Sequence, residues 1–146
     1  MKTSQNGVAL VEFALILPLL LLLTFITTEF GRAMYQYNTI TKSVRDAVRY
    51  LSTQTPGTHI PQAKNLIVYG NLAGTGTPLA LGLTIGNVLD PTWQPAGTNP
   101  VINTVTVTVS GYKFTPLFRS VFGIAFADAN GQIPYNNISA TMRSYL

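Results

Sequence analysis

The stretch VALVEFALILPLLLLLTFITT, residues 8–28, is apolar almost without a break and decides how the chain is built. Glu12 is its only charged residue. A helix needs roughly 20 apolar residues to cross the hydrocarbon core of a bilayer. A glutamate inside such a helix costs free energy unless a partner or a function offsets that cost. The sequence therefore predicts a membrane-anchored protein whose span carries a functional carboxylate.

The remainder of the 146-residue chain has room for a helical extension and one small domain. Many of the remaining charges gather just after the span, at Arg32, Lys42, Arg45, Asp46 and Arg49. Residues 53–146 are instead rich in Thr, Asn, Gly and Pro, which is typical of short strands and turns. The net charge of +4 forms no basic face dense enough to follow phosphates, so no binding to nucleic acid is expected.

The residue types that usually carry catalysis are scarce. The chain has no cysteine, which excludes disulfides, thiolate metal sites and cysteine nucleophiles. Its single histidine, His59, lies in a Pro-rich break with no candidate nucleophile beside it. The five acidic residues are scattered, and the glycine-rich stretch 70–82 lacks the lysine of a phosphate-binding loop. We therefore expect no enzymatic activity, no catalytic residue, no metal and no cofactor.

Three interpretations of the N-terminal region are open. A cleaved export signal is disfavoured, because the apolar run exceeds the usual length of about 7–15 residues and no A-x-A pattern follows it. A plain uncleaved anchor is the second, although basic residues stand on both sides of the span, with Lys2 before it and Arg32 after it. Taken literally, the positive-inside rule would then leave the C-terminal part in the cytoplasm. The third interpretation accounts for more residues, because Glu12 is the fifth residue after Gly7 and the leader ending at Gly7 is short and polar.

This spacing resembles the class III processing site of type IV prepilins and pseudopilins, which an inner-membrane aspartyl peptidase cuts after the glycine. Three segments are similar to the TadE family of the tight-adherence (type IVc) pilus apparatus: VEFALILPLLLLL (11–23), TEFGRAMYQYNTIT (28–41) and RDAVRYLS (45–52). Near the C-terminus, VTVTVS (105–110), KFTPLF (113–118) and ISATMRSY (138–145) also resemble the pattern of that family. Residues 53–100 carry no such resemblance.

The resemblance implies a minor pseudopilin of a bacterial pilus assembly and secretion apparatus, cut between Gly7 and Val8. It divides the chain into a leader (1–7), a transmembrane helix (8–30), an amphipathic extension (31–52) and an extracytoplasmic β-rich head (53–146). The N-terminus is expected in the cytoplasm and the head outside the cytoplasmic membrane, with a pilus as a further destination. The implied partners are the prepilin peptidase, other pseudopilins, a major pilin, an inner-membrane platform protein and the lipid bilayer.

Two residues of the span have predicted roles in assembly. After cleavage, the carboxylate of Glu12 can pair with the new amino terminus at Val8 of a neighbouring subunit and so set the register of a filament. The alternative is that Glu12 lies one turn inside the span and reaches back to the lipid headgroups. Pro18 removes a backbone donor and predicts a kink, which either eases extraction from the bilayer or is inert.

Beyond the span, apolar residues recur at helical spacing from Ala33 to Leu51. We expect this stripe to pack on the protein's own sheet rather than to form a coiled-coil seam, and the helix to end between Ser52 and Pro56. The basic residues off the stripe, with Arg32, Arg45 and Arg49 foremost, are candidates for contact with headgroups or partners.

The predicted fold class is α+β and pilin-like: one long N-terminal helix packed on a small antiparallel sheet. Strands are expected at 66–69, 104–109 and 139–145, and the middle one alternates threonine with valine so that its valines face the core. Residues 79–89 could be strand or loop. Residues 113–127 could be a short amphipathic helix on the sheet or a loop at the membrane surface.

A rival function is a static single-span anchor whose head binds an envelope or surface partner. The state of the mature N-terminus separates the two, because a static anchor has no need to begin at Val8. A subunit of a type II-like secretion pseudopilus is a third possibility and differs mainly in its partners.

Overall fold

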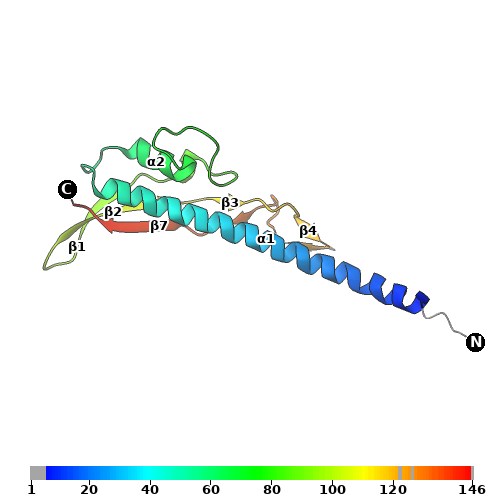
Figure 1. The fold of residues 1–146 in the computed structure, drawn as a ribbon. Coiled ribbons are helices and arrows are strands. Elements are labelled where there is room, and N and C mark those ends of the chain that lie inside the picture. The colour runs from blue at the N-terminus through cyan, green and yellow to red at the C-terminus, as the bar shows by residue number, and fades with distance from the viewer. Residues whose placement is uncertain (1–5, 122, 126, 146) are drawn as a thin grey trace, which may run out of the picture.

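A computed structural model describes residues 6–121, 123–125 and 127–145, and its dominant element is a single long helix. This helix, α1 (Asn6–Ser52), carries the head at its C-terminal half and projects beyond it at its N-terminal half (Figure 1). The helix ends at Ser52, within the range Ser52 to Pro56 in which it was predicted to end. It continues through Pro18 and Gly31 as one element. The head adds a second helix, α2 (Ile60–Tyr69), and a 3-10 turn, η1 (Ile85–Asn87).

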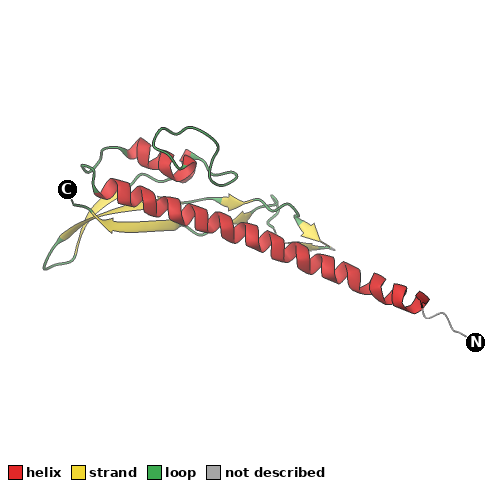
Figure 2. Ribbon diagram, viewed as in Figure 1, coloured by secondary structure: helices red, strands yellow, loops and turns green. Residues whose placement is uncertain are grey.

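The head contains one three-stranded sheet and two smaller strand pairs (Figure 2). The order β1–β2–β7 is antiparallel throughout and joins β1 (Thr92–Ala96), β2 (Ile102–Val109) and β7 (Ile138–Arg143). The pairs are β3 (Lys113–Phe114) with β6 (Ile133–Pro134), and β4 (Ser120–Val121) with β5 (Ile124–Ala125). The predicted α+β class, with a long helix packed on an antiparallel sheet, is confirmed.

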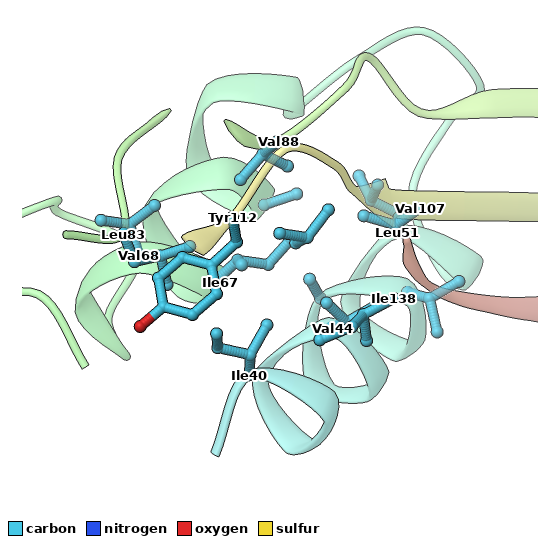
Figure 3. Packing of buried hydrophobic residues seen from close by; sticks show 14 of the residues in the cluster. Ile40, Val44, Leu51, Ile67, Val68, Leu83, Val88, Val107, Tyr112 and Ile138 are labelled. Carbon is cyan, nitrogen blue, oxygen red and sulfur yellow. The ribbon is translucent and has the colours of Figure 1, made fainter. Parts of the chain in front are cut away.

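The core lies between the C-terminal half of α1, helix α2 and the inner face of the sheet. The alternation predicted for residues 104–109 is confirmed, because Val105, Val107 and Val109 are buried while the intervening threonines are partly exposed. On α1 the residues Ile40, Val44, Ala47, Val48 and Leu51 are also buried. Figure 3 shows the α1 side chains meeting those of α2 and β2 in one cluster. The stripe on α1 therefore docks on the protein's own head, as predicted.

The strand predicted at 66–69 is wrong, because these residues form the end of α2. Pro61 stands in the first turn of this helix, where its missing N–H costs nothing, and Gly70 ends the helix in a left-handed conformation with φ 73°. Ala63 and Ile67 are four residues apart and both buried, so the burial follows a helical period. Four consecutive apolar letters could not distinguish the two structures without these flanking signals.

Residues 113–127 do not form the amphipathic helix that was one of the two predictions for them. Strands β3, β4 and β5 occupy this segment instead, and residues 122 and 126 lie outside the described part of the chain. Gly123, at φ 81° between β4 and β5, supplies the left-handed residue that a tight hairpin requires. The strands of this segment lie along α1 on the side towards its N-terminus (Figure 1).

Two tyrosines tie the head to the middle of α1. The hydroxyl of Tyr112 lies 2.6 Å from Oε1 of Gln36 and 2.9 Å from the carbonyl oxygen of Leu81, both of which accept hydrogen bonds. The hydroxyl of Tyr135 donates to the carbonyl oxygen of Ala33 at 2.6 Å. Burial, together with the neighbouring Tyr135, raises the pKa of Tyr112 to about 12. Burial also raises the pKa of Tyr135.

Replacing Ile67 with alanine should test the core and the helical assignment of residues 66–69. Ile67 is fully buried, and deleting a buried isoleucine side chain to alanine costs about 2–5 kcal/mol of unfolding free energy. The measurement is urea unfolding of the full chain in detergent micelles, followed by tyrosine fluorescence and circular dichroism. Leu72→Ala is the matched control, because Leu72 is exposed. Equal losses for the two variants would contradict the packing described.

The tyrosine pair predicts a loss of stability at alkaline pH. The folded pKa of Tyr112 is about 12, above the ordinary value of 10.0. The folded state therefore keeps a proton that the unfolded chain releases, and stability that is fully present below pH 10 falls as the pH rises towards 12. In Tyr112→Phe this decline should be shallower, and the lost hydrogen bond should cost about 0.5–1.5 kcal/mol at neutral pH. Unfolding free energies measured from neutral to alkaline pH would contradict this if both proteins declined equally.

Candidate functional site

The N-terminal half of α1 has no covering from the head. Its most apolar 18-residue window has a mean hydropathy of 2.6 and no buried residue, so among the described residues this helix is long and apolar enough to cross a membrane. Large side chains are exposed all round it, including Val8, Leu10, Phe13, Leu15 and Leu19. An exposed apolar surface of this length is unfavourable in water, so the structure fits a single-pass membrane anchor.

The predicted processing and register residues all lie on this uncovered half. Gly7 and Val8 form its first turn, and Glu12 stands one turn further on, exposed among apolar side chains. Within the described residues Glu12 has neither an ion-pair partner nor a hydrogen-bond donor. Pro18 lies within the helix without breaking it. These four positions therefore lie along the uncovered end of α1, away from the head.

Three threonines mark the end of the apolar half. The hydroxyl groups of Thr24, Thr27 and Thr28 each donate to the backbone carbonyl four residues earlier, at 2.8–2.9 Å. A threonine that bonds its own helix in this way leaves no unpaired polar group on the helix surface. This stretch of α1 is therefore compatible with lipid even though its composition has become more polar.

Glu29 is the functional candidate that sequence reasoning missed. Its carboxylate accepts two hydrogen bonds from Nη1 of Arg32, at 2.7 and 2.9 Å, and one from the backbone N–H of Leu117 at 3.0 Å. The Glu29 side chain is only 15% exposed, so this ion pair is partly shielded from water. The i, i+3 spacing to Arg32 at the end of the span was a visible signal. The third partner, 88 residues away in sequence, was not.

An apolar groove of about 370 Å³ lies beside this ion pair, between α1 and the segment after β3. The ring centroids of Phe25 and Phe118 are 4.7 Å apart at one end of it, and those of Tyr37 and Tyr135 are 5.8 Å apart at the other. Glu29 is the only charged residue in its lining. The groove runs from the apolar half of α1 to the junction between the helix and the head, so it lies partly beside the candidate membrane span and partly beside the head.

The three arginines proposed for headgroup or partner contacts lie at different heights. Arg32 is tied to Glu29, and its guanidinium carbon lies 5.4 Å from the centroid of the Phe114 ring, within reach of a cation–π contact. Arg45 and Arg49 are exposed and lie near the C-terminal end of α1. At 1.5 Å per residue, Arg49 is about 26 Å from Arg32 along the helix.

The described residues contain no cluster suited to catalysis or to a metal. No group of three or more His, Cys, Asp or Glu side chains comes together within the described part of the chain. The Nδ1 atom of His59 lies 2.9 Å from the hydroxyl of Thr58, and its ring lies 6.2 Å from that of Tyr50. Asp90 pairs with Lys64 at 2.8 Å.

Comparison with known proteins finds a family match for most of α1. The family model described as TadE-like protein matches residues 7–49, which contain the proposed processing site, the whole apolar half and most of the docked half of α1. The resemblance noted from the sequence is therefore confirmed over this segment, whereas the C-terminal motifs lie outside the match. No curated protein and no solved structure matches the chain. Residues 7–49, which make up most of α1, are therefore similar to TadE-like proteins.

Proposed function

We propose that this chain is a minor pseudopilin: a structural component of a tight-adherence pilus machine, matured by a prepilin peptidase and active through helix packing. The observation that carries the proposal is the glutamate five residues after Gly7, inside a segment that matches the TadE-like family. The exposed apolar half of α1 supports it, because a filament core built from such helices would cover that surface.

In this proposal residues 1–7 are a cytoplasmic leader and residues 8–30 cross the bacterial cytoplasmic membrane. Residues 31–52 form the extension that carries the head, residues 53–146, outside it. The peptidase is the enzyme and this chain is its substrate, so the chain itself has no catalytic residue. Cleavage after Gly7 leaves an ammonium group on Val8 at the end of a helix.

Assembly then depends on two features of the span. The Val8 ammonium of one subunit pairs with the Glu12 carboxylate of the next, and a subunit in the wrong register leaves a charge unpaired in a low-dielectric setting. Pro18 gives the helix one position at which the backbone ladder is already interrupted, which eases its withdrawal from the bilayer. The partners are another pseudopilin, a major pilin and the platform protein, for which the exposed Arg45 and Arg49 offer contacts.

The maturation step makes a direct prediction. Protein purified from membranes of its native host should begin at Val8 and lack the first seven residues, but only when the prepilin peptidase is present. Gly7→Leu should keep the full length, and a side chain at position 7 has open space around it, so the variant keeps its fold. Intact mass and N-terminal sequencing provide the measurement. A full-length chain in both strains would leave the static anchor as the function.

Glu12→Ala should be processed normally and then fail to assemble. A hydrogen bond to a charged group contributes about 1.5–3 kcal/mol, so incorporation into the pilus fraction should fall about ten- to hundred-fold. Quantitative immunoblots of membrane and sheared pilus fractions would measure it. Val11→Ala is the matched control, because Val11 is similarly placed and exposed but uncharged. Equal incorporation of both variants would remove the register role from Glu12.

A further inference from the structure

The segment that follows β3 presents apolar side chains to the outside of the molecule. We define the described residues 117–121 and 123–125, which include β4 and β5, as the hairpin segment. Leu117 is 68% exposed and Phe118 is 41% exposed, and Phe30 of α1 beside them is 67% exposed. A cluster of large exposed apolar residues on a small head marks a surface that is covered in the working state.

The position of this segment along α1 indicates what covers it. About 20 residues of helix cross the hydrocarbon core, so a span that begins at Val8 ends near Thr27. Phe118 packs on Phe25, with ring centroids 4.7 Å apart, and Phe25 lies inside that span. Figure 1 shows β4 lying along α1 on the N-terminal side of β3. The hairpin segment therefore reaches down to the level at which α1 leaves the bilayer.

Several polar groups at this level are satisfied within the protein. Glu29 is paired with Arg32 and also accepts the backbone N–H of Leu117, so that N–H needs no water. The hydroxyls of Thr27 and Thr28 are bonded to α1 itself. Non-helical backbone at membrane depth is tolerated only where its polar groups have partners. Because β4 and β5 pair over only two residues each, the hairpin segment suits the interfacial zone rather than the centre of the bilayer.

The groove beside the hairpin segment continues the same surface. Ile26 and Phe30 contribute both to the groove and to the exposed apolar side of α1, so its wall is continuous with the lipid-facing surface of the span. All of its lining except Glu29 is apolar or aromatic, and Glu29 is occupied by Arg32 and Leu117. An unbranched hydrocarbon chain is the ligand that such a lining accepts without leaving a polar group unpaired.

From these observations we propose that the hairpin segment is a second membrane-binding element. It lies in the outer interface of the bilayer beside α1, with Leu117 and Phe118 among the acyl chains and a lipid acyl chain in the groove. The hydrogen bond from the N–H of Leu117 to Glu29 fastens it to the helix, and the segment fixes how deeply α1 sits and which side of the head faces the membrane. The inference rests on α1 crossing a bilayer, but it does not depend on cleavage at Gly7 or on pilus assembly.

Because the chain has no cysteine of its own, an introduced cysteine can be labelled at one chosen position. Single-cysteine variants Leu117→Cys, Leu19→Cys and Val101→Cys of the full chain are labelled with bimane and placed in phosphatidylcholine vesicles doped with a nitroxide-labelled phospholipid. The three positions are matched in exposure, at 68%, 68% and 60%. Leu19 lies in the span, and Val101 lies in the β1–β2 connection at the far end of the head. Quenching by the nitroxide reports contact with lipid.

We expect the label at 117 to be quenched as strongly as the label at 19 and several-fold more than the label at 101. Quenching at 19 with none at 117 would overturn the inference while leaving the membrane span in place. A label at 117 that is shielded from the aqueous quencher iodide but not quenched by the nitroxide lipid would also overturn it, because another protein chain would then cover the surface. Absence of quenching at 19 would overturn both the span and the inference.

Discussion

The architecture depends on one constraint: the two halves of a single continuous helix need different surroundings. The N-terminal half of α1 is apolar on every side, whereas the C-terminal half is apolar along one stripe and polar elsewhere. A helix that is apolar all round needs a low-dielectric surrounding, and a striped helix needs a partner for one face only. The head supplies that partner with its sheet and with α2, and it leaves the first half bare for lipid or for other helices.

The change of environment along α1 is visible in the different surroundings of the Glu29 and Glu12 carboxylates. Glu29, at the boundary, accepts three hydrogen bonds from two donor atoms, Nη1 of Arg32 and the backbone N of Leu117, and is largely shielded. Glu12, deeper in the apolar half, has no partner among the described residues. The unpaired Glu12 is the position at which the proposed function places an intermolecular contact. In the proposed function that contact is the amino terminus of the neighbouring subunit.

The features that could be predicted from the sequence are those whose residues lie close together along the chain. The span, the stripe and the end of α1 were predictable because their patterns are local and long, and the alternation in β2 was equally clear. The run 66–69 was misassigned because four apolar residues fit either period, and the helix was decided by Pro61 and Gly70 outside the run. The N–H of Leu117 that binds Glu29 comes from a strand-rich segment 88 residues away, and no local pattern encodes such a contact. Gly7 and Glu12 were found by spacing, and their role stays a prediction about partners.

In the proposed function, the hairpin segment has to leave the bilayer together with α1. If only α1 were embedded, extraction would remove one cylinder from the bilayer and would leave the head untouched. If Leu117 and Phe118 also lie among the acyl chains, these two side chains must be covered again when α1 is. In the proposed assembly, lipid then leaves the groove beside Phe25 and Phe118. The surface that holds the subunit in the bilayer thus becomes a surface that assembly can bury, and the free energy lost on leaving lipid is offset by packing in the filament.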